Sequence, residues 1–208
     1  MDLHDFRRNY SLGKLARQDL SVNPFDQFRA WFEQILSTDI ADPTSMIVAS
    51  VDSSGQPSQR YVLLKHFDVK GFVFFTDTGS QKGQEIAQNP KVSLLFPWHQ
   101  FERQVRITGT AELLPLKQVE EYFYSRPELS QQAAICSLQS RVIHSRGELE
   151  AQFEAVGKDS SLKLPERWGG YCVKAQSFEF WQGGENRLHD RFRYQQQGEK
   201  WSISRLQP

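Results

Sequence analysis

The chain has 208 residues, of which 38% are hydrophobic and 24% are charged. These values fit a globular protein with one sizeable apolar core and exclude a wholly disordered chain. The 25 basic and 25 acidic residues balance to a formal net charge of zero, so the protein lacks the basic excess that gathers a polyanion such as DNA.

The first segment, residues 1–22, is polar and irregular, and we expect it to be a mobile arm. It carries acids where a secretory signal would carry bases. No apolar run approaches the roughly 20 residues that span a bilayer. The two cysteines lie in no metal-like spacing. We therefore expect a cytoplasmic protein with reduced thiols and no passage through a membrane.

The rest of the chain alternates between strand and helix patterns. Asn23 and Pro24 start an amphipathic helix with an aromatic face. Strand patterns follow at 45–51, 59–66, 72–76, 91–96 and 104–113, with a capped helix at 80–88. Helices are expected at 116–124, 130–138 and 146–156, and strands at 171–175, 177–181, 191–194 and 201–206. Such closely spaced strands predict a mainly β protein with flanking helices, built as an antiparallel barrel that the tail strands complete.

Several common sites have no counterpart in the sequence. No GxGxxG follows a strand, and GxxxxGK[ST] and GxSxG do not occur. The five histidines form no HExxH or HxH pattern. These patterns argue against a Rossmann site, a P-loop, a serine-hydrolase elbow and a zinc site.

Two segments before residue 90 have the residues of an anion site. Arg60 and Lys65 stand at the ends of an apolar strand, where a spacing of five points them to opposite faces, so one strand can address two anions. Lys82 follows Gly79 in the first turn of a helix, where free N–H groups and the helix dipole favour an anion. A strand with solvated ends and a plain helix cap remain the alternatives.

Two later segments add to this pattern. Tyr122, Arg126 and Ser130 are spaced by four, so at a helix end they can offer a phenol, a guanidinium and a hydroxyl to one phosphate. Surface scatter is the alternative. Arg187, His189 and Arg191 alternate along an extended segment with Trp181 nearby. Three cations on one face repel each other unless an anion or an electron-rich ligand lies there.

The ordered series RYVLLK, FFTDTGSQK, SLLFPW, ERQVRITG, YFYSRP, LQSR, FWQGGENRLHDRF and RLQP resembles the pyridoxine 5'-phosphate oxidase family of FMN enzymes, from about Arg7 to Pro208. The resemblance implies an FMN-binding split β-barrel over residues 23–208. It also implies a homodimer with the flavin held between subunits. The implied reaction oxidises pyridoxamine or pyridoxine 5'-phosphate to pyridoxal 5'-phosphate, with O₂ as acceptor and H₂O₂ as product, and NH₃ from the amine.

The resemblance also assigns site residues by their position in these motifs. It implies that FMN is held by Arg60, Tyr61, Val62, Leu63, Leu64, Lys65, Phe75, Thr76, Gln81, Lys82, Gln104, Gln139, Ser140, Trp181 and Arg191. It implies that the substrate meets Arg7, Arg8, Asn9, Tyr10, Lys65, Tyr122, Arg126, Ser130, Arg187, Leu188 and His189. In the family pattern Lys65, Tyr122, Arg126 and Ser130 grip the substrate phosphate. Arg187 and His189 are the expected catalytic residues, which align the substrate C4' carbon, and Arg191 is expected to stabilise negative charge on the reduced flavin.

Three positions depart from the forms usual in the family. Gln81 stands where Arg is often found, which removes a charge near the FMN phosphate. Phe75 replaces a common Tyr, and Asn186 replaces a common His. Two other functions stay open: a split-barrel flavoprotein that acts on a different acceptor, and a carrier that binds pyridoxal phosphate or FMN without turnover.

Overall fold

The computed structural model describes residues 1–5, 8–158 and 162–208. Its helices are α1 (Pro24–Leu36), α2 (Gln81–Gln88), α3 (Leu116–Ser125), α4 (Glu128–Cys136) and α5 (Arg146–Gly157). Its strands are β1 (Ser45–Val51), β2 (Pro57–Leu63), β3 (His66–Asp68), β4 (Gly71–Asp77), β5 (Lys91–Trp98), β6 (Arg103–Leu113), β7 (Trp168–Gln182), β8 (Asp190–Gln197) and β9 (Lys200–Leu206). Short 3-10 turns lie at Arg17–Asp19, His99–Phe101 and Glu185–Arg187.

The described strands form one sheet in the order β2-β1-β5-β6-β7-β4-β3, and β8 pairs with both β7 and β9. Strand β7 is antiparallel to β4, with Gly170 opposite Phe75, and antiparallel to β8, with Trp181 opposite Arg191. The predicted mainly β class with flanking helices is therefore confirmed.

Several predicted strand boundaries differ from the structure, and two of the differences bear on the site. The strands expected at 171–175 and 177–181 are one strand, β7, because the exposed Gln176 keeps the alternation of the strand instead of breaking it. The strand expected to run to His66 ends at Leu63, and the N–H of Lys65 instead donates to the carbonyl of Val73 (2.8 Å). Arg60 and Lys65 therefore do not share a strand, and the argument from their five-residue spacing does not hold.

The chain divides into two compact units. The first comprises residues 1–48, 93–109 and 175–208, and the second comprises residues 49–92 and 110–174. No helix in the described ranges is long and apolar enough to cross a membrane. The same ranges contain no group of three or more His, Cys, Asp or Glu residues placed to hold a metal ion.

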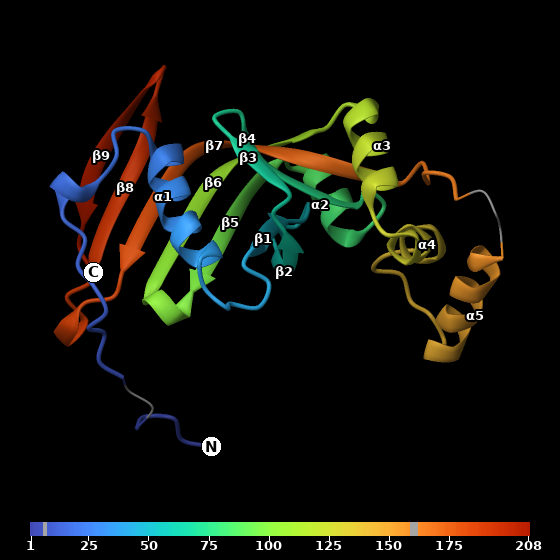
Figure 1. Cartoon of the computed structure of the whole chain (residues 1–208), viewed down its shortest axis with the longest axis horizontal. Helices are drawn as coiled ribbons and strands as arrows, with labels where there is room; N and C mark the ends of the chain where they lie inside the picture. Colours follow the sequence, from blue (N-terminus) through green and yellow to red (C-terminus); the bar gives the residue numbers. More distant parts are fainter. Residues whose placement is uncertain (6–7, 159–161) are drawn as a thin grey trace. The chain divides into compact units, whose positions relative to one another are not determined.

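The core of the first unit forms where the aromatic face of α1 meets β7 (Figure 1). The helix begins as predicted, since the Asn23 side chain accepts a hydrogen bond from the Phe25 N–H (2.9 Å) and Pro24 takes the first position. Phe25 meets Phe178 with ring centroids 5.0 Å apart, and Trp31 meets Phe180 at 5.3 Å. Burying each ring contributes roughly 1.5–3 kcal/mol, so this contact holds β7 in place.

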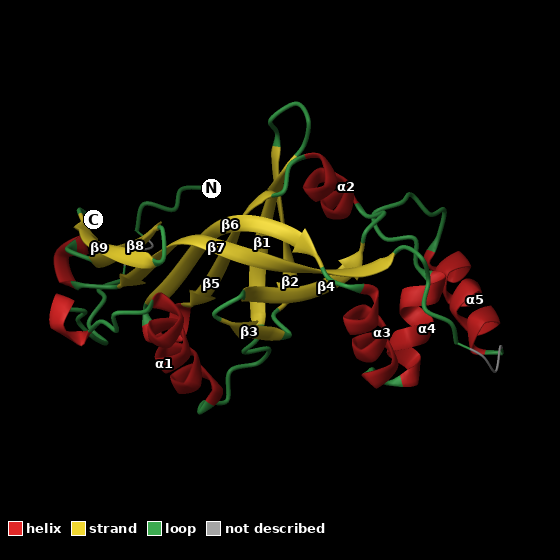
Figure 2. Ribbon diagram, turned by 90° about the horizontal axis from the view of Figure 1, so that it is seen from above, coloured by secondary structure: helices red, strands yellow, loops and turns green. Residues whose placement is uncertain are grey.

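In the second unit, α3, α4 and α5 form a group of helices (Figure 2). Glycine at position 170 of β7 allows the close approach of Phe75 on β4, because a Cβ there would lie 2.7 Å from the Phe75 ring. Phe75 in turn stacks on Tyr122 of α3, with ring centroids 3.8 Å apart. This stack fixes the last turn of α3 relative to β4.

Candidate functional site

A cavity of about 360 Å³ in the second unit, here the phosphate cavity, collects side chains from β2, β4 and α2 to α4. It brings together most of the residues expected to hold the flavin or the substrate phosphate in this unit, namely Tyr61, Val62, Leu63, Lys65, Phe75, Thr76, Lys82, Tyr122, Arg126, Ser130 and Gln139. Pro127 and Trp168 complete the lining. Residues that lie far apart in the sequence therefore share one cavity.

Arg126 lines this cavity and carries a buried nitrogen, Nη1, that has no hydrogen-bond partner among the described residues. Its guanidinium lies 4.5 Å from the ring of Trp168, and its Nη1 is buried without a hydrogen-bond partner in the described part of the chain. Nε1 of Trp168 is also buried without a partner there. Burial lowers the pKa of Arg126. The guanidinium nevertheless stays charged at any ordinary pH. Leaving such a donor unsatisfied costs on the order of 1–3 kcal/mol, so the arrangement favours an anionic ligand that accepts from Arg126.

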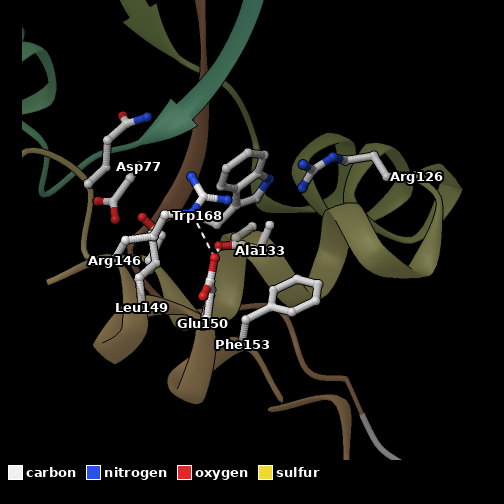
Figure 3. Close-up of a pocket in the computed structure, with 12 residues that line it drawn as sticks. Asp77, Arg126, Ala133, Arg146, Leu149, Glu150, Phe153 and Trp168 are labelled. Carbon is white, nitrogen blue, oxygen red and sulfur yellow. Dashed lines mark hydrogen bonds and ion pairs between the residues drawn. The ribbon is translucent and has the colours of Figure 1, made fainter. Parts of the chain in front are cut away.

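Trp168 also borders a second cavity of about 540 Å³ on the side of α4 and α5 (Figure 3). Arg126 and Gln139 line both cavities as well. At the second cavity, the exposed Arg146 forms an ion pair with Glu150 (2.7 Å). The sequence analysis did not single out Trp168, although a tryptophan directly before Gly169 and Gly170 is a signal of close packing.

Lys82 is a buried cation whose hydrogen-bond acceptors are all neutral. Its side chain is 6% exposed, and Nζ donates to Gln139 Oε1 (2.6 Å), Thr76 Oγ1 (3.0 Å) and Ser80 Oγ (3.3 Å). Burial, followed by the charge of Arg60, lowers the pKa of Lys82 to about 8. A ligand anion at Lys82 would favour the protonated form.

The structure does not place Arg60 and Gln81 in the lining of the phosphate cavity. Arg60 donates to Ser50 Oγ and Ser58 Oγ (2.5 Å each) and pairs with Glu85 (3.3 Å), which also accepts from Gln81 (2.8 Å). Burial acts to raise the pKa of Glu85, but hydrogen bonds from both serines and Gln81 hold it below its usual value. Glu85, which the sequence analysis missed, is therefore a buried carboxylate that balances the charge of Arg60.

A cavity of about 690 Å³ in the first unit, here the arm cavity, collects the second predicted group. It is lined by Arg8, Asn9, Tyr10, Gly184, Asn186, Arg187 and His189. Asn186 and Arg187 both have left-handed backbone angles, with φ of 55° and 62°. Asparagine tolerates this region but arginine rarely adopts it, and such strain collects at functional sites. The N–H of Gly184 donates to His189 Nδ1 (3.1 Å), so neutral His189 carries its proton on Nε2.

Trp181 and Arg191 stand opposite each other on β7 and β8. Trp181 contacts His189 with ring centroids 4.7 Å apart. Arg191 donates through Nε to Glu179 (2.9 Å), and Arg106 forms an ion pair with the same carboxylate. Glu179 is 4% exposed, and the sequence analysis missed it. In the sequence, Glu179 stands out as a charged residue between two aromatic residues, Phe178 and Phe180.

Four other predicted site residues lie outside the linings of the phosphate cavity and the arm cavity. Arg7 falls outside the residues that the structure describes. Leu64 is a core residue at 3% exposure, and Leu188 is 72% exposed and borders a different cavity beside the C-terminus. Gln104 is half-buried on β6, and Ser140 is exposed with a left-handed φ of 70°.

Two family models match the chain. Residues 32–158 match the model described as pyridoxamine 5'-phosphate oxidase, and residues 168–208 match the pyridoxine 5'-phosphate oxidase C-terminal dimerisation region. The second match confirms the predicted homodimer. Together the two models account for most of the chain.

Whole-chain relatives agree with the family models. The chain is 52% identical over 211 residues to a protein of Vibrio cholerae serotype O1 named pyridoxine/pyridoxamine 5'-phosphate oxidase, with 100% of both chains covered. A protein of the same name from Teredinibacter turnerae is 53% identical over 211 residues, again with 100% of both chains covered.

Two solved structures share the fold. PhzG from Burkholderia lata 383, in complex with tetrahydrophenazine-1-carboxylic acid, is 27% identical with a TM-score of 0.87, and the match covers 93% of this chain and 98% of that one. A pyridoxamine 5'-phosphate oxidase-related, FMN-binding protein from Nostoc punctiforme has a TM-score of 0.74 at 15% identity, over 91% of this chain and 100% of that one. The predicted split-barrel fold is thus confirmed. With full-length relatives above half identity and both family models matched, this chain belongs to the pyridoxamine 5'-phosphate oxidase family.

Proposed function

We propose that the chain oxidises pyridoxamine or pyridoxine 5'-phosphate to pyridoxal 5'-phosphate with a bound FMN and O₂. The observation that carries this proposal is the phosphate cavity, where the unpartnered Nη1 of Arg126 lies among the lining residues with Lys65, Tyr122 and Ser130. Two cations and two hydroxyls in one cavity suit a dianionic phosphate ester, because charge-assisted hydrogen bonds are the strong ones. The four residues are expected to bind and orient the substrate by its phosphate.

The residues around Lys82 fit an FMN phosphate. Lys82, Thr76 and Gln139 offer a buried ammonium, a hydroxyl and an amide, and Lys82 has only neutral acceptors in the described chain. When bound, FMN would supply the redox chemistry of the proposed oxidation, with O₂ as the final electron acceptor. Gln81 adds no charge there, and Glu85 offsets Arg60. We therefore expect flavin retention to depend strongly on Lys82.

The residues of the arm cavity are proposed to align the reacting carbon. Arg187 and His189 both line this cavity, and Nε2–H of His189 is available to donate because Nδ1 accepts from Gly184. Arg191 is held by Glu179, so its guanidinium has a fixed direction. A fixed cation beside the flavin would stabilise the negative charge that develops on reduction.

A visible spectrum tests the proposal. The purified protein, loaded with FMN, is expected to lose its yellow absorption when pyridoxamine 5'-phosphate is added without oxygen, and to regain it in air. Oxygen uptake with the same compound should accompany turnover. Flavin colour that pyridoxamine 5'-phosphate does not bleach would favour a flavoprotein with another substrate, and a colourless protein indifferent to FMN would favour a carrier of pyridoxal phosphate.

FMN binding is expected to weaken at alkaline pH. Because the pKa of Lys82 is about 8 before FMN binds, and an anion raises it, affinity should change little between about pH 7, where the FMN phosphate is mostly dianionic, and pH 8, and should fall above that. The dissociation constant of the apoprotein should rise by up to about tenfold per pH unit above the pKa, with proton uptake on binding. Fluorescence titration of FMN at several pH values measures this. Lys82→Met should bind FMN more weakly at neutral pH, and its affinity should no longer fall above pH 8. If the affinity of this variant still falls above pH 8, the pH dependence belongs to another group.

A further inference from the structure

Glu102 is a buried acid that the proposed reaction does not use. It follows the turn His99–Phe101 between β5 and β6, in a left-handed conformation with φ of 51°. Its side chain is only 4% exposed. Its carbonyl accepts from the N–H of Gly183 (2.7 Å), next to the strand that carries Trp181. This backbone hydrogen bond to Gly183 fixes the position of Glu102 within the first unit.

The carboxylate of Glu102 binds the N-terminal arm. Oε2 accepts from the backbone N–H groups of Ser11 (2.8 Å) and Leu12 (2.9 Å), and Oε1 accepts from Nη2 of Arg8 (2.7 Å). Burial acts to raise the pKa of Glu102, but the bonds from Leu12, Arg8 and Ser11 hold it below its usual value. A second carboxylate holds the next part of the arm, since Asp190 Oδ2 accepts from the N–H of Leu15 (2.9 Å).

These bonds set the place of Tyr10. The Tyr10 ring contacts Trp181 and His189 edge-on, with centroids 5.6 Å and 5.4 Å apart. It lies so close to Gly183 that a Cβ at that position would be 2.7 Å from Tyr10 Cδ1. Tyr10 is therefore a wall of the arm cavity, and its position depends on the residues that hold the arm on either side of it.

We propose that Glu102 is a positioning residue for the reaction, which anchors the arm so that Tyr10 closes the arm cavity over the substrate ring. This inference rests on the proposed function. Glu102 touches neither substrate nor cofactor in this role, since it acts through the two amides and Arg8. Without the anchor, the arm would have to be ordered by each substrate molecule, and the cost of ordering would appear as weaker binding.

The test compares Glu102→Gln with Glu112→Gln, which alters an exposed carboxylate that forms a 3.8 Å ion pair with Lys174. An amide cannot accept all three bonds, so Glu102→Gln should raise KM for pyridoxamine 5'-phosphate about tenfold and change kcat and FMN affinity less than about twofold. Glu112→Gln should match the wild type. A fall in kcat or FMN affinity with an unchanged KM would overturn the proposal.

A double-mutant cycle separates positioning from general destabilisation. If Glu102 acts through Tyr10, Glu102→Gln should have little further effect on KM in a Tyr10→Ala background, whereas additive effects would contradict the mechanism. Hydrogen exchange of the wild-type holoenzyme gives a readout that needs no variant, because the amides of Ser11 and Leu12 should exchange slowly. Fast exchange of these amides in an active enzyme would contradict the anchoring role of Glu102 but not the proposed function. Slow exchange in a protein that does not oxidise pyridoxamine 5'-phosphate would instead contradict the proposed function.

Discussion

Replacing Arg126 with methionine is expected to raise KM for pyridoxamine 5'-phosphate about a hundredfold, because a charge-assisted hydrogen bond contributes ~1.5–3 kcal/mol and the phosphate also loses a full charge. Methionine keeps an unbranched stem against Trp168, so the wall between the two cavities is preserved. FMN affinity should change less than about twofold, since the FMN phosphate is proposed to bind at Lys82, which is held by Thr76, Ser80 and Gln139. Steady-state kinetics and fluorescence titration measure the two effects.

Three comparisons make this result specific to the phosphate. Arg126→Lys keeps the charge but loses the planar guanidinium that can donate two parallel hydrogen bonds. Its KM for pyridoxamine 5'-phosphate should therefore lie between those of the wild type and the methionine variant. Arg146→Met removes an exposed arginine of the second cavity and should leave KM unchanged. Pyridoxamine without its phosphate should show a much smaller difference between wild type and Arg126→Met. An equal loss with both compounds would mean that Arg126 has a structural role only.

Local signals in the sequence were sufficient for the starts of α1 and α2, whereas α4 begins and ends two residues before the predicted bounds. The start of α1 was predicted at Asn23 and Pro24, and the structure shows the cap bond from Phe25. Helix α2 likewise begins after Ser80, whose hydroxyl accepts from the N–H of Gly83 (3.3 Å). Capping and periodicity act within one or two turns, so a short stretch of sequence contains all the information they need.

Strand ends were harder, because tertiary pairing determines where a strand stops. Lys65 was expected in a strand with Arg60, but its N–H bonds to Val73 after β2 has ended. β7 continues through Gln176, although two separate strands were expected on either side of that residue. The alternation of apolar and polar residues describes the two faces of a strand but not its length, since neighbouring strands supply the hydrogen bonds.

The predicted site was incomplete in a systematic way. Residues that are proposed to contact a ligand were identified through their motifs, whereas the buried groups that hold those residues were missed. Trp168 lies against Arg126, Glu179 holds Arg191, and Glu85 pairs with Arg60. No spacing rule links these partners, because each pair is brought together by the fold. Two of these groups do have a signal in the sequence, since Glu179 is an acid inside an apolar run and Trp168 directly precedes two glycines.

The second large effect is expected at Arg187. Replacing it with leucine should lower the rate constant of anaerobic flavin reduction by pyridoxamine 5'-phosphate about a hundredfold, because misplacing a reacting atom by about 1 Å can cost that much. The left-handed φ of 62° makes the same demand on leucine as on arginine, so the comparison reports on the side chain more than on the backbone. FMN affinity should be retained, since the FMN phosphate is proposed to bind at Lys82, whose hydrogen bonds go to Thr76, Ser80 and Gln139.

Stopped-flow absorbance in the absence of oxygen isolates this step from reoxidation and product release. Arg193→Leu is the matched control, because Arg193 is an exposed arginine of β8 outside the lining of the arm cavity. It should reduce flavin at the wild-type rate. Arg187→Lys should recover part of the lost rate if the charge matters, and none if the planar guanidinium is needed to align C4'. An unchanged rate of flavin reduction in Arg187→Leu would show that this residue does not align the reacting carbon, however strongly KM responds.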